Sequence, residues 1–179
     1  MKEKGLVMVI YLSLMQITLS SSLSKSKIQR TTAELDTLLS DARPWLYRLA
    51  LAITAQPEMA EDVAQEALVR AAHSREKLRT ADEPKAWLRT VLVRCAINAL
   101  KRGQPIKPME EAVLSDPTEA IAVHQVLNRL NPTDRAVLAL VYFEQLSYAE
   151  IGEMLAIPAG TVGSRLHTAR AAFEKEWSK

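Results

Sequence analysis

The stretch GQPIKPMEEAVLSDPTE, residues 103–119, is the feature that most constrains the fold. Its three prolines and one glycine prevent a helix from running through it, so it predicts an extended, flexible linker. On either side, apolar residues recur at helical spacing, and no stretch alternates with period two for long enough to suggest a strand. The sequence therefore predicts an all-α fold in which two small helical domains, residues 35–102 and 120–179, follow an N-terminal extension, residues 1–34.

The composition fits two small cores and excludes several kinds of site. The chain has 179 residues and is 48% hydrophobic, enough for one modest core or two small ones. Its net charge is only +2, so any nucleic-acid surface must come from how the charges are distributed. Cys95 is the single cysteine, and His73, His124 and His167 lie too far apart for metal-ligand spacing. We expect no disulfide, metal or cofactor, and a reducing, cytoplasmic location.

The N-terminal sequence MKEKGLVMVIYLSLMQITL argues against that location. A charged start and an apolar run from Leu6 to Leu14 have the outline of a signal peptide. The run is shorter than the about 20 residues of a membrane span, and the SSSLSKSK that follows lacks a cleavage signature. Three interpretations stay open: a start of translation at Met8 or Met15, a weak contact with a membrane or a partner, and export.

A helix predicted over residues 85–102 has a polar side of one sign. The segment contains no acidic residue, and Pro84 before it suits the first turn of a helix. An ordinary solvated face mixes its charges, so this one indicates a polyanion, most simply a phosphate backbone. An anionic membrane surface or an acidic protein are the alternatives. The basic residues are Lys85, Arg89, Arg94, Lys101 and Arg102.

The helix predicted over residues 58–73, EMAEDVAQEALVRAAH, places Asp62, Gln65, Glu66 and Arg70 on one face. On periodicity alone, a solvated helix face accounts for them. A helix predicted from about residue 36 precedes this segment and stops at Pro57, and a charge-rich break follows it at residues 74–83.

The segment LSYAEIGEMLAIPAGTVGSRLHTAR predicts two short helices joined by a tight turn. Ser147 and Glu150 form a capping box that starts the first helix, which we expect to bury Ile151 and Leu155. The second helix buries Val162, Leu166, Ala169 and Phe173 and presents the small residues Gly160, Thr161, Ser164, Thr168 and Ala171 with Lys175, flanked by Arg165 and His167.

Two structures account for that pattern. One is a helix-turn-helix whose second helix enters the major groove of DNA, where hydroxyl, arginine and histidine side chains reach bases and phosphates. The other is a corner between two helices that packs against a third. The acidic first helix followed by basic residues in the second favours the DNA-binding interpretation.

These segments together resemble a known family. YFEQLSYAEIGEMLAIPAGTVGSRLHTARAAF is similar to region 4 of the bacterial extracytoplasmic-function sigma factors of the sigma-70 family, and LNPTDRAVLAL resembles the helix before it. AEDVAQEALVRAA resembles region 2.2, and EPKAWLRTVLVRCAINALKR resembles regions 2.3 to 2.4. Two independent motifs in the right order are more specific than either alone.

The resemblance implies a sigma factor that binds core RNA polymerase and directs promoter recognition and transcription initiation without chemistry of its own. It implies docking on the polymerase clamp coiled coil through Asp62, Gln65 and Glu66. It also implies promoter DNA and an anti-sigma factor as partners. The implied contacts with the -10 element are Arg75, Lys77, Arg79, Lys85, Arg89, Arg94, Asn98, Lys101 and Arg102; those with the -35 element are Thr161, Ser164, Arg165, His167, Thr168 and Arg170.

The chain departs from the family pattern at several of these positions. Gly163 and Thr168 stand where members usually place basic residues, and Thr90 and Arg94 replace the usual Arg and Asn of region 2.4. The resemblance therefore implies no particular promoter sequence.

Two other classes of protein share parts of the pattern. A helix-turn-helix regulator acting without core polymerase needs only the C-terminal motif, and binding to core polymerase distinguishes it. A membrane-associated adaptor would use the N-terminal apolar run and the cationic helix, and cell fractionation tests that. An enzyme is not expected, because the sequence has no Gly-rich phosphate loop, no nucleophile beside a base and no carboxylate cluster.

Overall fold

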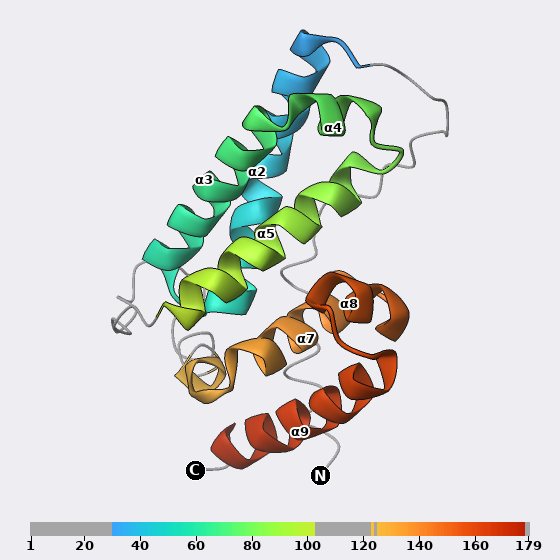
Figure 1. The fold of residues 1–179 in the computed structure, drawn as a ribbon. Coiled ribbons are helices and arrows are strands. Elements are labelled where there is room, and N and C mark those ends of the chain that lie inside the picture. Colours follow the sequence, from blue (N-terminus) through green and yellow to red (C-terminus); the bar gives the residue numbers. More distant parts are fainter. Residues whose placement is uncertain (1–29, 103–122, 124, 178–179) are drawn as a thin grey trace.

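The computed structural model describes residues 30–102, 123 and 125–177, and the regular structure within these ranges is entirely helical (Figure 1). This confirms the predicted all-α fold. The N-terminal domain contains α2 (Thr32–Thr54), α3 (Pro57–His73), α4 (Arg75–Thr80) and α5 (Pro84–Lys101). The C-terminal domain contains α7 (Pro132–Tyr142), α8 (Tyr148–Leu155) and α9 (Ala159–Trp177). The predicted linker and the N-terminal apolar run lie outside the described residues.

Local capping signals set the ends of α2. Thr31 and Glu34 form a capping box at its start, which satisfies backbone N–H groups that the helix itself leaves unpaired. At its end Ala55 adopts a left-handed conformation with φ of 54°, and its N–H donates to the carbonyl of Leu51. Helix α2 therefore begins earlier than predicted, and Pro57 is the first residue of α3.

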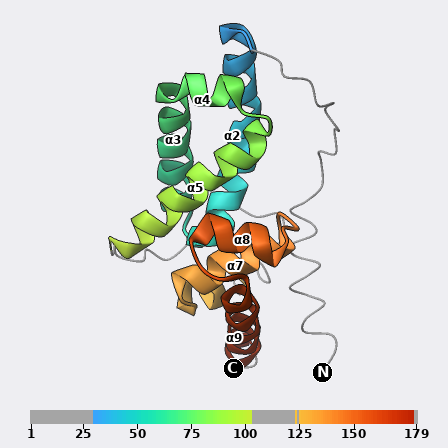
Figure 2. The ribbon, with the colours of Figure 1, turned by 45° about the vertical axis from the view of Figure 1, so that its right-hand side comes forward.

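The segment predicted as a break over residues 74–83 contains the short helix α4, so that prediction was wrong. Leu78 of α4 is fully buried and packs into the core. At the end of α4, the Arg30 guanidinium donates to the carbonyl of Ala81 over 3.0 Å, and Arg79 Nε donates to the carbonyl of Arg30 over 3.0 Å. One apolar side chain and this reciprocal pair of bonds hold α4 across the ends of α2 and α3 (Figure 2).

The core of the N-terminal domain lies between α2, α3 and α5, which pack on one another. Helix α5 has the predicted start at Pro84 and buries one stripe of its surface. Apolar surface removed from water in this way stabilises the domain by about 25 cal/mol per Å². The largest fully buried side chains of these three helices are Leu46, Leu49, Ile53, Val63, Leu88, Leu92 and Val93.

The C-terminal domain forms around α9. The predicted side chains Val162, Leu166, Ala169 and Phe173 are the buried residues of this helix. Ser147 and Glu150 form the predicted capping box of α8. Ile151 is fully buried, whereas Leu155 is only partly buried, so the predicted pair was half correct.

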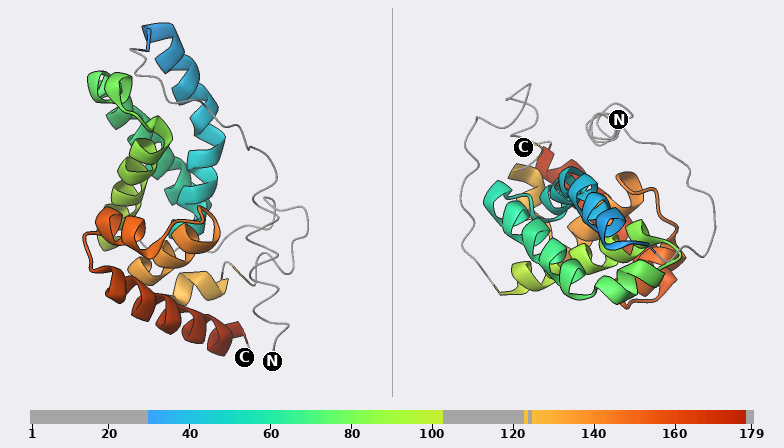
Figure 3. Two further views of the ribbon diagram at one scale, coloured as in Figure 1. Left: turned by 90° about the vertical axis from the view of Figure 1, so that its right-hand side faces the viewer. Right: turned by 90° about the horizontal axis from the view of Figure 1, so that it is seen from above.

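The C-terminal domain packs against one end of the N-terminal domain (Figure 3). Helix α7 contacts α2 and α5, and α8 contacts α5. A carboxylate of the C-terminal domain, Glu144, binds Trp45 of α2 and Arg89 of α5 at this boundary. Asn128 Nδ2 adds a 3.0 Å bond to the carbonyl of Ala55. Contact between the two domains was not predicted from the sequence.

The tight turn between α8 and α9 depends on the absence of a side chain at Gly152. A Cβ atom at Gly152 would lie 2.6 Å from the carbonyl oxygen of Ile157, closer than atoms of this kind approach. Ala156 in the turn is left-handed, with φ of 55°. At Gly160 in the first turn of α9, by contrast, a Cβ would meet no atom within 4 Å.

We therefore expect Gly152→Ala to lower the free energy of unfolding by about 1 to 3 kcal/mol, because the turn must move to admit a methyl group. Gly160→Ala is the matched control: it should leave that free energy unchanged or raise it by up to about 1 kcal/mol, because alanine favours the helix and has room. Urea denaturation of both variants measures the difference. Equal effects at the two positions would show that the turn does not depend on the missing side chain.

Candidate functional site

The solvent side of α9 carries small side chains, as the sequence analysis predicted. Gly160, Ser164 and Thr168 are exposed, and Thr161 is partly exposed. The Ser164 hydroxyl donates to the carbonyl of Thr161, and the Thr168 hydroxyl donates to that of Ser164, each over 3.0 Å. These hydroxyl protons are therefore directed at the helix, and each oxygen keeps its acceptor lone pairs for an outside donor. Because these exposed side chains are short and polar, a flat or grooved partner can approach the α9 backbone closely.

The three larger polar side chains of this region differ in their surroundings. Arg165 Nη1 donates to Asp134 Oδ1 of α7 over 2.8 Å, so this arginine joins the two helices as well as flanking the exposed face. His167 and Arg170 are exposed, and neither has a hydrogen-bond or ion-pair partner among the described residues. Arg170 and Lys175, both exposed and without an ion-pair partner among the described residues, are therefore cations that α9 offers without first breaking an ion pair.

Gly163 leaves space on this face that an aromatic ring partly covers. A Cβ atom at position 163 would lie 3.5 Å from Cε2 of Tyr148, which is an ordinary van der Waals contact. Tyr148, the first residue of α8, is among the exposed large apolar side chains. Tyr148 was not among the predicted site residues, although it directly follows Ser147 of the capping box.

The α5 residues predicted to contact DNA lie on different faces. Lys85 and Arg89 are four residues apart and share one face, whereas Arg94 lies nine residues from Lys85, about 180° around the helix. The structure therefore places Lys85 and Arg89 toward Trp45 and the α7–α8 corner. Arg94, Asn98 and Lys101 lie elsewhere on the helix and face solvent.

Lys85 and Arg89 form a compact site with residues of other helices. Lys85 Nζ lies 5.1 Å from the centre of the Trp45 ring, and the Arg89 guanidinium lies 6.0 Å from it. Both distances allow cation–π attraction. Glu144 accepts one bond from Trp45 Nε1 over 2.7 Å and one from Arg89 Nε over 2.6 Å.

The basic residues of α4 are also unequal. Arg75 pairs with Asp36 of α2 over 2.8 Å, and Arg79 bonds to the backbone of Arg30. Lys77 is exposed and has no ion-pair partner among the residues described. Two of the three therefore hold α4 in place as well as presenting positive charge.

The α3 face predicted to dock on a protein is partly acidic and partly apolar. Asp62 and Gln65 are exposed, but Glu66 accepts a 2.6 Å bond from Arg70 and lies 3.7 Å from Arg102 at the end of α5. Glu66 is therefore not the simple solvated residue that periodicity indicated. Val69 shares this face and is 47% exposed, which adds an apolar group to it. The sequence analysis missed Val69, which its spacing from Gln65 and Glu66 could have revealed.

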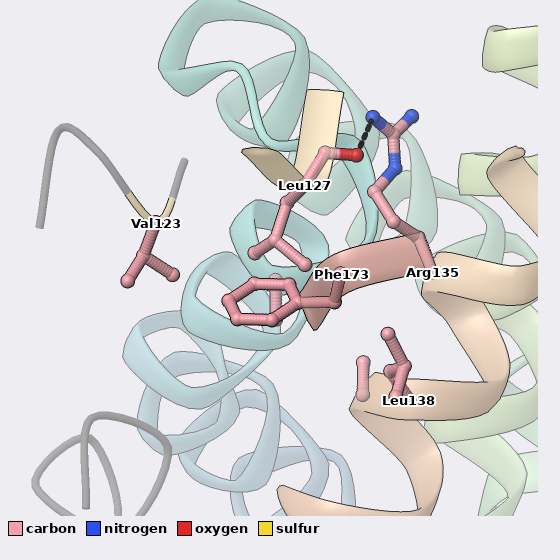
Figure 4. A pocket seen from close by; sticks show the side chains of 7 residues that line it. Val123, Leu127, Arg135, Leu138 and Phe173 are labelled. Carbon is pink, nitrogen blue, oxygen red and sulfur yellow. Dashed lines mark hydrogen bonds between the residues drawn. The ribbon is translucent and has the colours of Figure 1, made fainter. Parts of the chain in front are cut away.

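A buried arginine lies where the C-terminal domain meets α2 (Figure 4). Arg135 Nη1 donates to the carbonyl of Leu127 over 3.0 Å, and burial lowers the pKa of Arg135 to about 10. It therefore stays charged at neutral pH. The small hollow beside it has apolar walls formed by Ala52, Val123, Leu127, Leu138, Ala139 and Phe173, so Arg135 has a structural role here. Across the residues described, no group of acidic, histidine and cysteine side chains could hold a metal ion.

Electrostatics at the start of α8 favour a charged carboxylate. Hydrogen bonds from the Ser147 hydroxyl and backbone N–H hold the pKa of Glu150 below its ordinary value, and the charge of Arg89 adds to this. The α8 side of the domain boundary is therefore acidic and faces the basic start of α5.

None of the helices described is both long enough and apolar enough to cross a membrane. Comparison with known proteins identifies the two domains. Residues 38–105 match the family model described as Sigma-70 region 2, and residues 120–173 match that described as Sigma-70, region 4.

Individual relatives agree with the two family models. The chain is 30% identical over 150 residues to the RNA polymerase sigma factor SigV of Bacillus subtilis, which covers 80% of this chain and 90% of the relative. It is 32% identical over 137 residues to the ECF RNA polymerase sigma factor SigM of Mycobacterium tuberculosis, covering 73% and 70%.

A solved structure shares the fold: the sigma factor RpoE of Bartonella quintana, determined with the anti-sigma factor NepR. It aligns with a TM-score of 0.64 at 20% identity, over 82% of this chain and 98% of that one.

The fold and the two matched regions define a sigma factor of RNA polymerase. Specifically, the chain belongs to the extracytoplasmic-function group of the sigma-70 family, as the sequence motifs indicated.

The Arg165–Asp134 pair gives a test of the geometry of the C-terminal domain. We expect a double-mutant cycle with Arg165→Ala and Asp134→Asn to yield a coupling energy of about 0.5 to 1 kcal/mol in the free energy of unfolding, because the pair is only partly exposed. Chemical denaturation of the four proteins measures it. Strictly additive effects would show that the two side chains do not interact in solution.

Proposed function

We propose that this sigma factor docks on core RNA polymerase through the exposed face of α3 and contacts promoter DNA through α4, α5 and α9. The observation that carries the proposal is the separation of surfaces: a partly acidic face with an exposed valine on α3, and basic or small polar faces on the other helices. Acidic and apolar groups suit a protein partner, whereas cations and hydroxyls suit phosphates and bases. The proposed domain boundaries are residues 35–102 and 120–179.

Each proposed surface follows from exposure as well as from the family pattern. On α3, Asp62 and Gln65 are open to a partner, and Glu66 would exchange its arginine partners for a new one. On α5, Arg94, Asn98 and Lys101 face solvent and are free to meet the -10 element. On α9, the small side chains permit close approach to the -35 element. Half or more of protein–DNA bonds go to phosphate and sugar, so these groups would mainly position the duplex.

The remaining roles follow from this assignment. The protein would form and break no covalent bond; it would supply specificity, and polymerase would supply catalysis. It would act in the cytoplasm, where RNA polymerase works. An anti-sigma factor is the expected regulator, and the fold neighbour from Bartonella quintana, solved with such a partner, supports that expectation.

Charge reversal on α3 tests the docking surface. We expect Asp62→Lys to weaken binding to core polymerase by about tenfold or more, because it places a cation where an anionic face meets its partner. The melting temperature should change little, because Asp62 is exposed and has no ion-pair partner among the described residues. Asp41→Lys, the same charge change at an exposed site on α2, should retain full binding. Similar affinities for the two variants, measured by fluorescence anisotropy with core polymerase, would refute the α3 assignment.

The -35 surface can be tested by adding and removing charge on α9. Gly163→Lys should raise the affinity of the holoenzyme for DNA of any sequence and steepen its salt dependence by about one unit, as one added phosphate contact would. It should also raise the free energy of unfolding by roughly 0.5 to 1 kcal/mol, because glycine is a poor helix former.

Arg165→Ala should weaken promoter binding by about 1 to 3 kcal/mol if Arg165 reads a base. Asp134→Asn is the control, since it breaks the same ion pair but keeps the arginine. Filter binding of both variants across a salt series distinguishes an Arg165 that contacts DNA from one that only holds α9 to α7. Equal losses for Arg165→Ala and Asp134→Asn would make Arg165 a structural residue, and no response to Gly163→Lys would place this face away from DNA.

A further inference from the structure

A buried carboxylate at the contact between the domains is bound to an arginine that the family pattern assigns to DNA. Only 5% of the Glu144 side chain and 14% of the Arg89 side chain are exposed. Glu144 Oε1 accepts from Trp45 Nε1, and Glu144 Oε2 accepts from Arg89 Nε. Lys85 Nζ lies 5.1 Å from the centre of the same indole ring. Trp45, Lys85 and Arg89 thus form an anion-binding site on the N-terminal domain, and its occupant comes from the C-terminal domain.

The chemistry of this site suits a phosphate as well as a carboxylate. A guanidinium and an ammonium supply the charge, and the indole N–H supplies a neutral donor. Arginine binds carboxylate and phosphate oxygens with the same donor geometry. The acidic start of α8, with Glu150 nearby, strengthens the attraction in the closed arrangement.

A buried ion pair is stable only while both partners remain together. Removing either charge leaves the other desolvated and unpaired, which is strongly unfavourable. Nε of Arg89 is therefore available to a phosphate only when Glu144 leaves and the α7–α8 corner withdraws from α5.

We propose that Glu144 acts as an internal competitor of promoter DNA: in the closed chain it binds Trp45 and Arg89, beside Lys85, and a backbone phosphate of promoter DNA takes that site when the domains separate. The inference rests on the proposed function, because it takes Lys85 and Arg89 to be DNA-binding residues. It adds Trp45 to the DNA-binding surface and identifies Glu144 as the residue that covers that surface in the closed chain.

The test uses the full-length protein without polymerase and a fluorescein-labelled single-stranded DNA of mixed sequence. Glu144→Gln keeps the acceptor for Trp45 but removes the charge opposite Arg89. It should raise DNA affinity by roughly tenfold and increase the radius of gyration in small-angle scattering. Glu153→Gln makes the same charge change at an exposed position of α8 and should alter neither quantity. Trp45→Phe keeps a ring for Lys85 but removes the same N–H donor from Glu144 and from an incoming phosphate, so it should change the affinity less than Glu144→Gln does.

A second substitution separates the inference from the function on which it rests. Adding Arg89→Ala to Glu144→Gln should abolish the gain in DNA affinity, because the vacated site then lacks its main cation. If the gain persists, Glu144 does not compete for Arg89 and the inference is wrong. If Glu144→Gln gains no more than Glu153→Gln, the inference is also wrong. In that case a loss of DNA binding by Arg89→Ala alone still upholds the DNA role of Arg89, whereas no loss overturns that role as well.

Discussion

The position of one domain against the other depends on the hydrogen-bond donors of one buried carboxylate, Glu144. A carboxylate removed from water is costly unless hydrogen-bonded donors replace its hydration. Glu144 has two such donors, and they come from two helices of the other domain. The α7–α8 corner is therefore held to one position over α2 and α5, and the Asn128 bond to Ala55 anchors the other end of the boundary. The apolar contacts around these hydrogen bonds are less directional, so they are compatible with that position but do not determine it.

Several of the arginines in this protein hold helices together. Arg79 secures α4, Arg135 lies buried in the C-terminal domain, Arg165 joins α9 to α7, and Arg89 joins the two domains. Arginine suits this use because its charge persists when buried and its planar group reaches several acceptors at once. A count of basic residues in the sequence therefore overestimates the positive surface available to DNA. Exposed cations without an ion-pair partner among the described residues, such as Lys77, Arg94, Lys101, Arg170 and Lys175, are the better guide to the salt dependence of binding.

Features that depend on neighbours along the chain could be predicted from the sequence. The capping box of Ser147 and Glu150 and the buried stripe of α9 follow from spacings of three and four residues. Helix α4 was missed because Leu78 is the one buried side chain among charged residues, too weak a periodic signal. The partners of Arg89 and Arg165 lie 55 and 31 residues away, beyond any local pattern. The helices of the site were thus predictable, but which of its cations are already paired was not.

The bonds of Arg30 to the end of α4 also bear on how the protein responds to proteases. Trypsin must take an arginine side chain into its specificity pocket before it cleaves the bond that follows. The Arg30 guanidinium is instead held against the carbonyl of Ala81, and its own carbonyl accepts from Arg79. The peptide bond after Arg30 is therefore protected as long as α4 stays folded. Its rate of tryptic cleavage reports local opening of α4 separately from global unfolding of the N-terminal domain.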